Sequence, residues 1–432
     1  MQPYCRQEKT LEAPFRNLPS MKEGLLISAT QMNSDLKRTM RAFLGNPTGL
    51  NLGTGSERDR EDSAIVLTGR SSTSVSSKFP RDGFTCVQRF ALLPSMNATR
   101  WWIPLGDPRW AQSAWQIYRP HARRGRLFKK LLLGVTQLSW TGWARHEVLI
   151  GSKGPLPLEI LASDITGERR PIFALSLGTP GRFRKLTVQI MRPDGEILGY
   201  AKLPLTRAAT ERVRHEATVL NRLSCVTSLR PHVPRIFHAG EWGDGYILVL
   251  SNGPSGLGPV EFGPLHQYFL IACAAAHRVD RPGHVLWEET ADKWRQSGGV
   301  LSSEWRALVQ TALEEARQAL DGEMIPCGLI HGDFAPWNTR MGNGSLFVFD
   351  WESAGWDLPL AWDAFHFHTQ VACLLNKNRE QVRSLRSAGG KNALLLLYLL
   401  NSICQILEEN APDGHLGLNY RRRLLADALS HA

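Results

Sequence analysis

The stretch HGDFAPWNTRMGNGSLFVFDWE, residues 331–352, decides how this chain of 432 residues is interpreted. It carries three oxygen-bearing side chains at fixed intervals: Asp333, Asn338 five positions later, and Asp350 twelve positions after that. Between the last two, an Asn-Gly pair predicts a tight turn and LFVFD predicts a strand. We therefore expect a short hairpin that returns Asp350 to the side of Asn338.

These side-chain types at this spacing suit the transfer of a phosphoryl group. The transfer needs a carboxylate near the acceptor hydroxyl and oxygen ligands that hold magnesium against the phosphates. In protein kinases, a His-x-Asp-x4-Asn loop supplies the base and one metal ligand, and a later Asp supplies another ligand. His331, Asp333 and Asn338 keep that spacing. The alternative, polar residues that only separate a turn from a strand, explains the full pattern less well.

HGDFAPWN followed by FVFDWE resembles the aminoglycoside phosphotransferase and choline kinase-like family, whose members carry H-G-D-x-x-x-x-N and a later hydrophobic-D-x-E. The resemblance covers residues 165–432. It implies a protein-kinase-like fold, with ATP and Mg²⁺ as cofactors. By position, it makes Asp333 the catalytic base and His331 a brace for the loop. It also makes Asn338 and Asp350 the ligands of Mg²⁺.

Two further carboxylates receive supporting roles. Glu352 is expected to make a structural hydrogen bond rather than a metal contact. The resemblance implies that Asp363, in LPLAWDAF, supports the catalytic loop from the following helix. A carboxylate on the surface of that helix is the alternative for Asp363.

The kinase template also requires a strand lysine that contacts the α- and β-phosphates and pairs with a helix glutamate. Lys202 lies on a predicted strand after a Pro-Asp-Gly turn, and Glu216 lies fourteen residues later on a predicted helix. We predict that these residues pair, with Glu211 as the second choice of partner. Solvated surface positions are the alternative for each.

The rest of the nucleotide is predicted to meet mainly backbone groups. In the loop SLGTPGR, Gly178, Thr179 and Gly181 would let amide groups approach the phosphates. The loop is not G-x-G-x-x-G, and Pro180 lacks an N–H donor. The adenine ring is expected to face Leu250 in the strand LVLS.

The predicted secondary structure changes along the chain, with strands first and helices second. This order predicts an α+β, two-lobed architecture. Residues 1–80 are expected to be disordered, and residues 81–160 to form an accessory Trp-rich basic region of unknown fold. A kinase-like N-lobe is predicted at 161–262, and a helical C-lobe with the catalytic loop at 263–432.

The Trp-rich region has five aromatic residues between Trp101 and Tyr118 and six basic residues between Arg119 and Lys130. Aromatic rings among cations are typical of nucleic-acid binding and of contact with an anionic membrane. No nucleic-acid module signature is present, so we expect tryptophans in a core and a solvated basic face. Nucleic acid is therefore not the expected partner, and peripheral contact with an anionic membrane is an alternative.

Bulk properties fit a cytoplasmic protein. The net charge of +11 favours anionic partners such as nucleotides. The seven cysteines are scattered and form no CxxC pair, which fits reduced thiols. No apolar run reaches the length of a membrane span, and the N-terminal residues lack the pattern of a secretory signal.

The favoured function is ATP- and Mg²⁺-dependent phosphorylation of a hydroxyl on a small molecule: a sugar, an aminoglycoside-like or choline-like compound, or a glycan precursor. A cationic acceptor would meet Glu288, Glu289 and Asp292, although solvated helix charges are the commoner explanation. The first alternative is a catalytically weak or regulatory nucleotide-binding module, suggested by the irregular phosphate loop. The second is nucleic-acid or membrane-surface binding through the Trp-rich region. The sequence does not indicate an oligomeric state.

Overall fold

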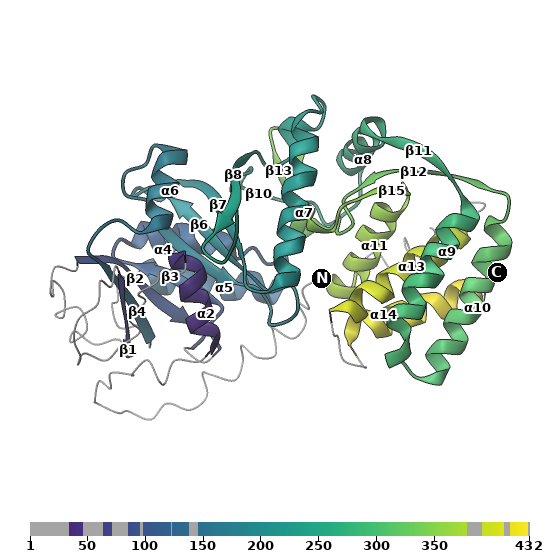
Figure 1. Cartoon of the computed structure of the whole chain (residues 1–432), viewed down its shortest axis with the longest axis horizontal. Helices are drawn as coiled ribbons and strands as arrows, with labels where there is room; N and C mark the ends of the chain where they lie inside the picture. Colours follow the sequence, from purple (N-terminus) through teal and green to yellow (C-terminus); the bar gives the residue numbers. More distant parts are fainter. Residues whose placement is uncertain are drawn as a thin grey trace. The chain divides into compact units, whose positions relative to one another are not determined.

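The chain divides into two compact units (Figure 1). We call residues 8–217, together with 235–252, the strand-rich unit, and the unit that contains residues 218–234 and 253–432 the helical unit. The computed structural model describes residues 34–45, 64–70, 85–95, 98–121, 123–137, 146–377, 391–409 and 415–430. Most of residues 1–80, predicted to be disordered, lies outside these ranges.

An antiparallel sheet organises the strand-rich unit, and its nine described strands follow the order β1-β4-β2-β3-β5-β6-β7-β9-β8. The predicted strands after residue 160, with their Pro-Asp-Gly and Gly-Asp-Gly turns, are confirmed as β5 to β9. The strands are β1 (Ala64–Arg70), β2 (Thr85–Leu93), β3 (Trp101–Leu105), β4 (His146–Ser152), β5 (Ile172–Leu177), β6 (Lys185–Met191), β7 (Ile197–Pro204), β8 (Ile236–Trp242) and β9 (Gly245–Ser251).

Each face of this sheet buries a core, because successive strand residues point to opposite sides. Trp102 packs with Phe43 and Phe90 on one face, and Trp101 packs with Trp115 on the other. These three tryptophans are at most 5% exposed, so they are core residues and do not offer rings for stacking on bases. The helices are α2 (Ser34–Leu44), α4 (Pro108–Ala114), α5 (Arg123–Gln137), α6 (Pro157–Thr166) and α7 (Arg207–Ser224).

The helical unit combines helices with two small three-stranded sheets, β10-β13-β14 and β11-β12-β15. The helices are α8 (Pro264–Ala276), α9 (Gly283–Ser297), α10 (Ser303–Leu320), α11 (Trp362–Leu375), α13 (Lys391–Glu408) and α14 (Leu416–Leu429). The strands are β10 (Gly256–Leu257), β11 (Arg278–Pro282), β12 (Met324–Ile330), β13 (Thr339–Gly342), β14 (Ser345–Val348) and β15 (Gly355–Pro359). The predicted hairpin is confirmed as β13 and β14. Strands β11, β12 and β15 lie within the predicted helical C-lobe and were not predicted, because such short segments have no diagnostic periodicity.

The α+β, protein-kinase-like architecture is confirmed. In the strand-rich unit, helix α7 follows the third of the strands β5, β6 and β7, which is where a kinase places its glutamate helix after its lysine strand. In the helical unit, α9, α10, α13 and α14 share one apolar core. Among the described residues, no helix is long and apolar enough to cross a membrane.

Two buried histidines lie in an aromatic cluster of the helical unit. The ring of His266 stacks on Phe262 at 5.2 Å and meets Phe367 edge-on at 4.7 Å. Its Nδ1 accepts the N–H of Gly263, and its buried Nε2 has no hydrogen-bond partner among the residues that the structure describes. Burial, together with the nearby His368, lowers the pKa of His266 to about 4. Burial also lowers the pKa of His368. Both rings are therefore neutral in the folded chain at neutral pH.

This cluster predicts that acid destabilises the helical unit. The folded pKa values lie below the unfolded value of 6.5, so the unfolded chain binds more protons and stability falls as pH drops from 6.5 toward about 4. The His266→Phe variant is expected to lose less free energy of unfolding than the wild type as pH falls, by up to about 1.4 kcal/mol per pH unit. Denaturant unfolding of the wild type and the variant at about pH 7 and pH 5 measures this difference. The exposed His284→Phe is the control, and equal pH dependence in all three proteins would contradict the prediction.

Candidate active site

The predicted catalytic loop, residues 331–338, follows strand β12 and leads into the β13–β14 hairpin. In the antiparallel pairing of β13 with β14, Thr339 lies opposite Val348, and the N–H of Phe349 donates to the carbonyl of Asn338 at 3.1 Å. Asp350 is the next residue, so the hairpin returns it to Asn338 as the sequence predicted. Asp350 has a left-handed backbone, with φ of 71°, which turns the chain as it leaves the hairpin.

Asp333 is held from two sides. Asn338 Nδ2 donates to its Oδ2 at 2.8 Å and to its main-chain oxygen at 2.9 Å. Its Oδ1 lies 2.9 Å from Nε2 of His366 on helix α11. Burial alone would raise the pKa of Asp333, but the hydrogen bond from His366 acts in the opposite direction, and the pKa is lowered to about 2. The side chain is 20% exposed, so this ionised carboxylate is both fixed and reachable.

The backbone of the loop is tied to Asp363. Its Oδ2 accepts the N–H of His331 at 2.7 Å, and its Oδ1 accepts the N–H of Gly332 at 2.9 Å. Asp363 is 1% exposed, so it is not a surface carboxylate. Burial raises its pKa, although His331 and the two N–H groups act in the opposite direction.

His331 occupies the centre of the loop and is fully buried. Its Nδ1 accepts the N–H of Asp333 at 3.2 Å, and its Nε2 lies 3.0 Å from the carbonyl of Phe349. Because a carbonyl only accepts, Nε2 is the protonated nitrogen. The ring packs against Trp351 at 4.7 Å between centroids. His331 therefore joins the catalytic loop to the end of the hairpin.

Asn338 and Asp350 are a chemically suitable pair for Mg²⁺, which prefers oxygen ligands. The amide nitrogen of Asn338 is committed to Asp333, which orients the amide group. No described residue donates to its Oδ1, so this oxygen suits a cation. Glu352 lies on a single helical turn, Trp351–Ser353, and is partly exposed.

In the strand-rich unit, Lys202 on β7 meets Glu216 on α7. Lys202 Nζ lies 2.6 Å from both carboxylate oxygens. Lys202 is 8% exposed and Glu216 is fully buried. Glu211, the second choice, is exposed and pairs with Arg207 at 3.5 Å. The structure thus brings Lys202 and Glu216 together and leaves Glu211 on the surface.

The predicted phosphate loop connects β5 and β6. The N–H of Gly178 donates to Lys185 at 2.9 Å, and Gly181 has a φ of 157°. Arg100 donates to Thr179 Oγ1 at 3.5 Å. Leu250 lies on β9, opposite Tyr200 of β7, and is 4% exposed. The loop connects two strands of the sheet that also contains Leu250 and Lys202.

Sequence reasoning missed His366, which contacts Asp333, and Arg100, which contacts the phosphate loop. A signal for His366 was present, since residues three apart on a helix share a face and His366 follows Asp363 by three positions. Arg100 had no such signal, because its contact spans 79 positions of the chain.

Comparisons with known proteins agree with these motifs. The model of the Phosphotransferase enzyme family matches residues 200–367. A comparison with curated proteins gives no match. Among solved structures, the apo form of a thermostable mutant of aminoglycoside phosphotransferase APH(4)-Ia is 15% identical with a TM-score of 0.47, covering 63% of this chain and 98% of that chain. A putative fructosamine-3-kinase from Thermobifida fusca YX-ER1 is 19% identical with a TM-score of 0.40, covering 65% and 100%.

The matched residues include Lys202, Glu216, the catalytic loop and Asp363. The resemblance predicted from HGDFAPWN and FVFDWE is thereby confirmed. Over residues 200–367, the chain is similar to the phosphotransferase enzyme family.

Proposed function

We propose that this protein transfers the γ-phosphoryl group of ATP, with Mg²⁺, to a hydroxyl group of a small molecule in the cytoplasm. The observation that carries the proposal is the Asp333 carboxylate, which is ionised, fixed by Asn338 and His366, and 20% exposed. A rigid and reachable carboxylate is what a hydroxyl needs to be oriented for attack on phosphorus. The family match over residues 200–367 supports the same chemistry.

In this reaction Asp333 orients the acceptor hydroxyl and takes its proton. The acceptor oxygen forms a bond to the γ-phosphorus while the bond from that phosphorus to the bridging oxygen breaks, and ADP leaves with the electron pair. The proton then passes from Asp333 to solvent. Asn338 and Asp350 would hold Mg²⁺, which neutralises phosphate charge when bound.

Lys202 is proposed to contact the α- and β-phosphates, with Glu216 fixing its ammonium group. Gly178, Thr179 and Gly181 would supply backbone groups to the phosphates, and the backbone near Leu250 would meet the adenine. The presence of base, metal ligands and lysine–glutamate pair favours an active enzyme over a regulatory nucleotide-binding module.

The helix α9 carboxylates do not favour a cationic acceptor. Glu289 pairs with Arg281 at 2.7 Å, and Asp292 pairs with Arg295. Among the described residues, Glu288 has no ion-pair partner, and one exposed charge is weak support for a cation site. A neutral hydroxyl compound, such as a sugar or a glycan precursor, is therefore the acceptor class we favour.

Asp333→Asn tests the proposal directly. Losing the base is expected to lower ATP-dependent transfer by about 10²- to 10⁴-fold. A panel of hydroxyl compounds would be screened for ADP release with Mg²⁺, and chelation of the metal is expected to abolish the signal. Thermal shift with Mg-ATP should stay at the wild-type value. The exposed Asp321→Asn is the control, and full transfer by Asp333→Asn would refute the assignment.

Glu216→Gln tests the nucleotide contact. Removing the charge that fixes Lys202 is expected to raise the KM for ATP about tenfold, because a hydrogen bond to a charged group contributes ~1.5 kcal/mol or more. Glu211→Gln, on the same helix but in an exposed ion pair, is expected to leave KM within about twofold. Steady-state kinetics at varied ATP compares them. Equal KM values in both variants would contradict a role for the Lys202–Glu216 pair.

A further inference from the structure

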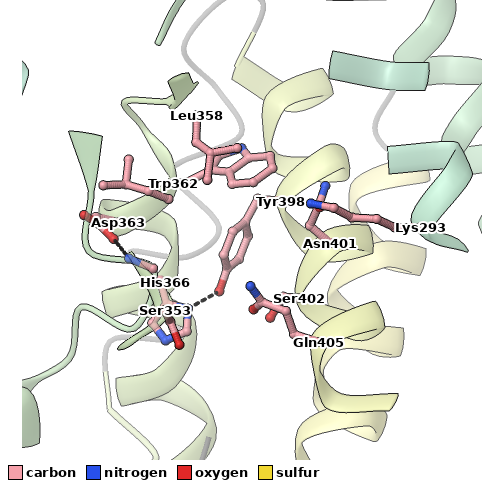
Figure 2. A pocket seen from close by; sticks show the side chains of 12 residues that line it. Lys293, Ser353, Leu358, Trp362, Asp363, His366, Tyr398, Asn401, Ser402 and Gln405 are labelled. Atoms are coloured by element: carbon pink, nitrogen blue, oxygen red, sulfur yellow. Dashed lines mark hydrogen bonds between the residues drawn. The ribbon is translucent and has the colours of Figure 1, made fainter. Parts of the chain in front are cut away.

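A line of buried polar side chains runs from Asp333 into the interior of the helical unit. Beyond the contact of His366 Nε2 with Asp333, Nδ1 of the same ring lies 3.3 Å from the hydroxyl of Tyr398 on helix α13. His366 and Tyr398 are 3% and 4% exposed. Figure 2 shows the two side chains pointing toward each other across a polar pocket. The imidazole thus bridges the base and a buried phenol.

The partners of His366 determine where its protons lie. An ionised carboxylate only accepts hydrogen bonds, so Nε2 carries the proton that faces Asp333. In the neutral ring Nδ1 is then an acceptor, and the Tyr398 hydroxyl is its donor. The side-chain amide of Gln370, one turn further along α11, also lies 3.1 Å from Nε2, and because an amide nitrogen only donates, a protonated Nε2 requires the Gln370 amide to present its oxygen to the ring.

The surroundings of Tyr398 fit this direction. Burial raises the pKa of Tyr398, partly offset by the buried Arg421 and by a hydrogen bond from Ser402. Arg421 also donates to the Ser402 hydroxyl at 2.6 Å. The described hydrogen-bond contact of the phenol oxygen is with His366 Nδ1, which can accept its proton.

We propose that His366 is a positioning residue for the transfer reaction, and that Tyr398 fixes its tautomer. His366 reaches Oδ1 of Asp333 while Asn338 reaches Oδ2, so each carboxylate oxygen has one donor and the carboxylate plane cannot rotate freely. The expected effect of His366 on turnover rests on the proposed function, whereas the expected tautomer of His366 does not. The kinase template includes no such histidine, because the residues of the template that bind metal and phosphate lie elsewhere in the fold.

The kinetic test compares three variants. His366→Leu is expected to lower kcat about 100-fold while the KM for ATP stays within about twofold, because a misoriented base slows only the chemical step. His366→Gln, whose amide also donates, is expected to recover most of that loss. The exposed His284→Leu is the matched control. A His366→Leu enzyme with wild-type kcat, or a folded His366→Gln enzyme as slow as His366→Leu, would overturn the proposal.

A second measurement does not depend on turnover. In ¹⁵N-histidine NMR spectra, His366 is expected to be the Nε2–H tautomer, and Tyr398→Phe is expected to shift its Nδ1 resonance. An Nδ1–H tautomer, or a resonance unmoved by Tyr398→Phe, would overturn the proposal even if the enzyme is active. Failure to find any acceptor would count against the proposed function and leave this result standing.

A different observation concerns helix α5 of the strand-rich unit. Leu127 and Leu131, one turn apart, are 62% and 63% exposed. Arg123, Arg126 and Lys130 lie beside them on the exposed face, while Phe128, Leu132 and Leu133 pack onto the core beneath Trp101. Among the described residues, no ion pair joins these three cations to a carboxylate. The helix therefore presents two leucines bordered by cations.

We infer that this face of α5 binds an anionic bilayer surface. Apolar residues flanked by cations suit a helix lying in the membrane interface, where leucines enter the acyl boundary and cations meet lipid phosphates. Nucleic acid fits the face less well, since exposed leucines have no partner on a phosphate backbone and the tryptophans are buried. The net charge of +11 has the same sign as this face.

Vesicle co-sedimentation tests this second proposal. The full chain is expected to bind phosphatidylserine–phosphatidylcholine vesicles and not phosphatidylcholine alone, with weakening at high salt. The double variant Leu127→Ser/Leu131→Ser is expected to weaken binding at least about tenfold, and Ile271→Ser, an exposed apolar residue of α8, is the control. Unchanged binding by the double variant, or binding to DNA that exceeds binding to anionic vesicles, would overturn it.

Discussion

The buried carboxylate of Asp363 is the contact on which the catalytic loop depends. Its two oxygens accept consecutive backbone N–H groups, those of His331 and Gly332, and each would cost ~1–3 kcal/mol if left buried without a partner. Gly332 has a φ of 78°, and a Cβ there would lie 2.0 Å from the carbonyl of Ser353. Only glycine fits, so the conformation of the residue before Asp333 is fixed. The position of Asp333, the next residue, therefore follows from that of Asp363.

The Lys202–Glu216 pair has a comparable place in the strand-rich unit, but its energetics differ. Taking two charges out of water costs nearly as much as their attraction returns, so a buried pair gives little net stability. Lys202 is 8% exposed, and its Nζ lies 2.6 Å from both oxygens of the Glu216 carboxylate. The pair therefore joins strand β7 to helix α7 and adds little net stability.

The sequence predicted those features that depend on short spacing. The Asp333–Asn338 interval, the Asn-Gly hairpin and the lysine strand before the glutamate helix are local patterns, and the structure contains all of them. Tyr398 and His366 meet across 32 positions and two helices, and no pattern within either helix identifies that contact. Strands β11, β12 and β15 were missed because each is a run of seven residues or fewer with no clear alternation.

The strands before residue 160 complete the sheet of the part of the chain that resembles the family, because β3 pairs with β5. Without β3, strand β5 would be an open edge with unpaired N–H and C=O groups, and β3 covers it by pairing Trp101 with Ser176 and Trp102 with Leu175. The same two tryptophans fill the cores on both faces of the sheet. Immediately before them, Arg100 accepts the N–H of Leu177 with its carbonyl and reaches Thr179 of the phosphate loop with its side chain. The region that resembled an accessory domain therefore closes the sheet edge and braces the loop through which the nucleotide is proposed to bind.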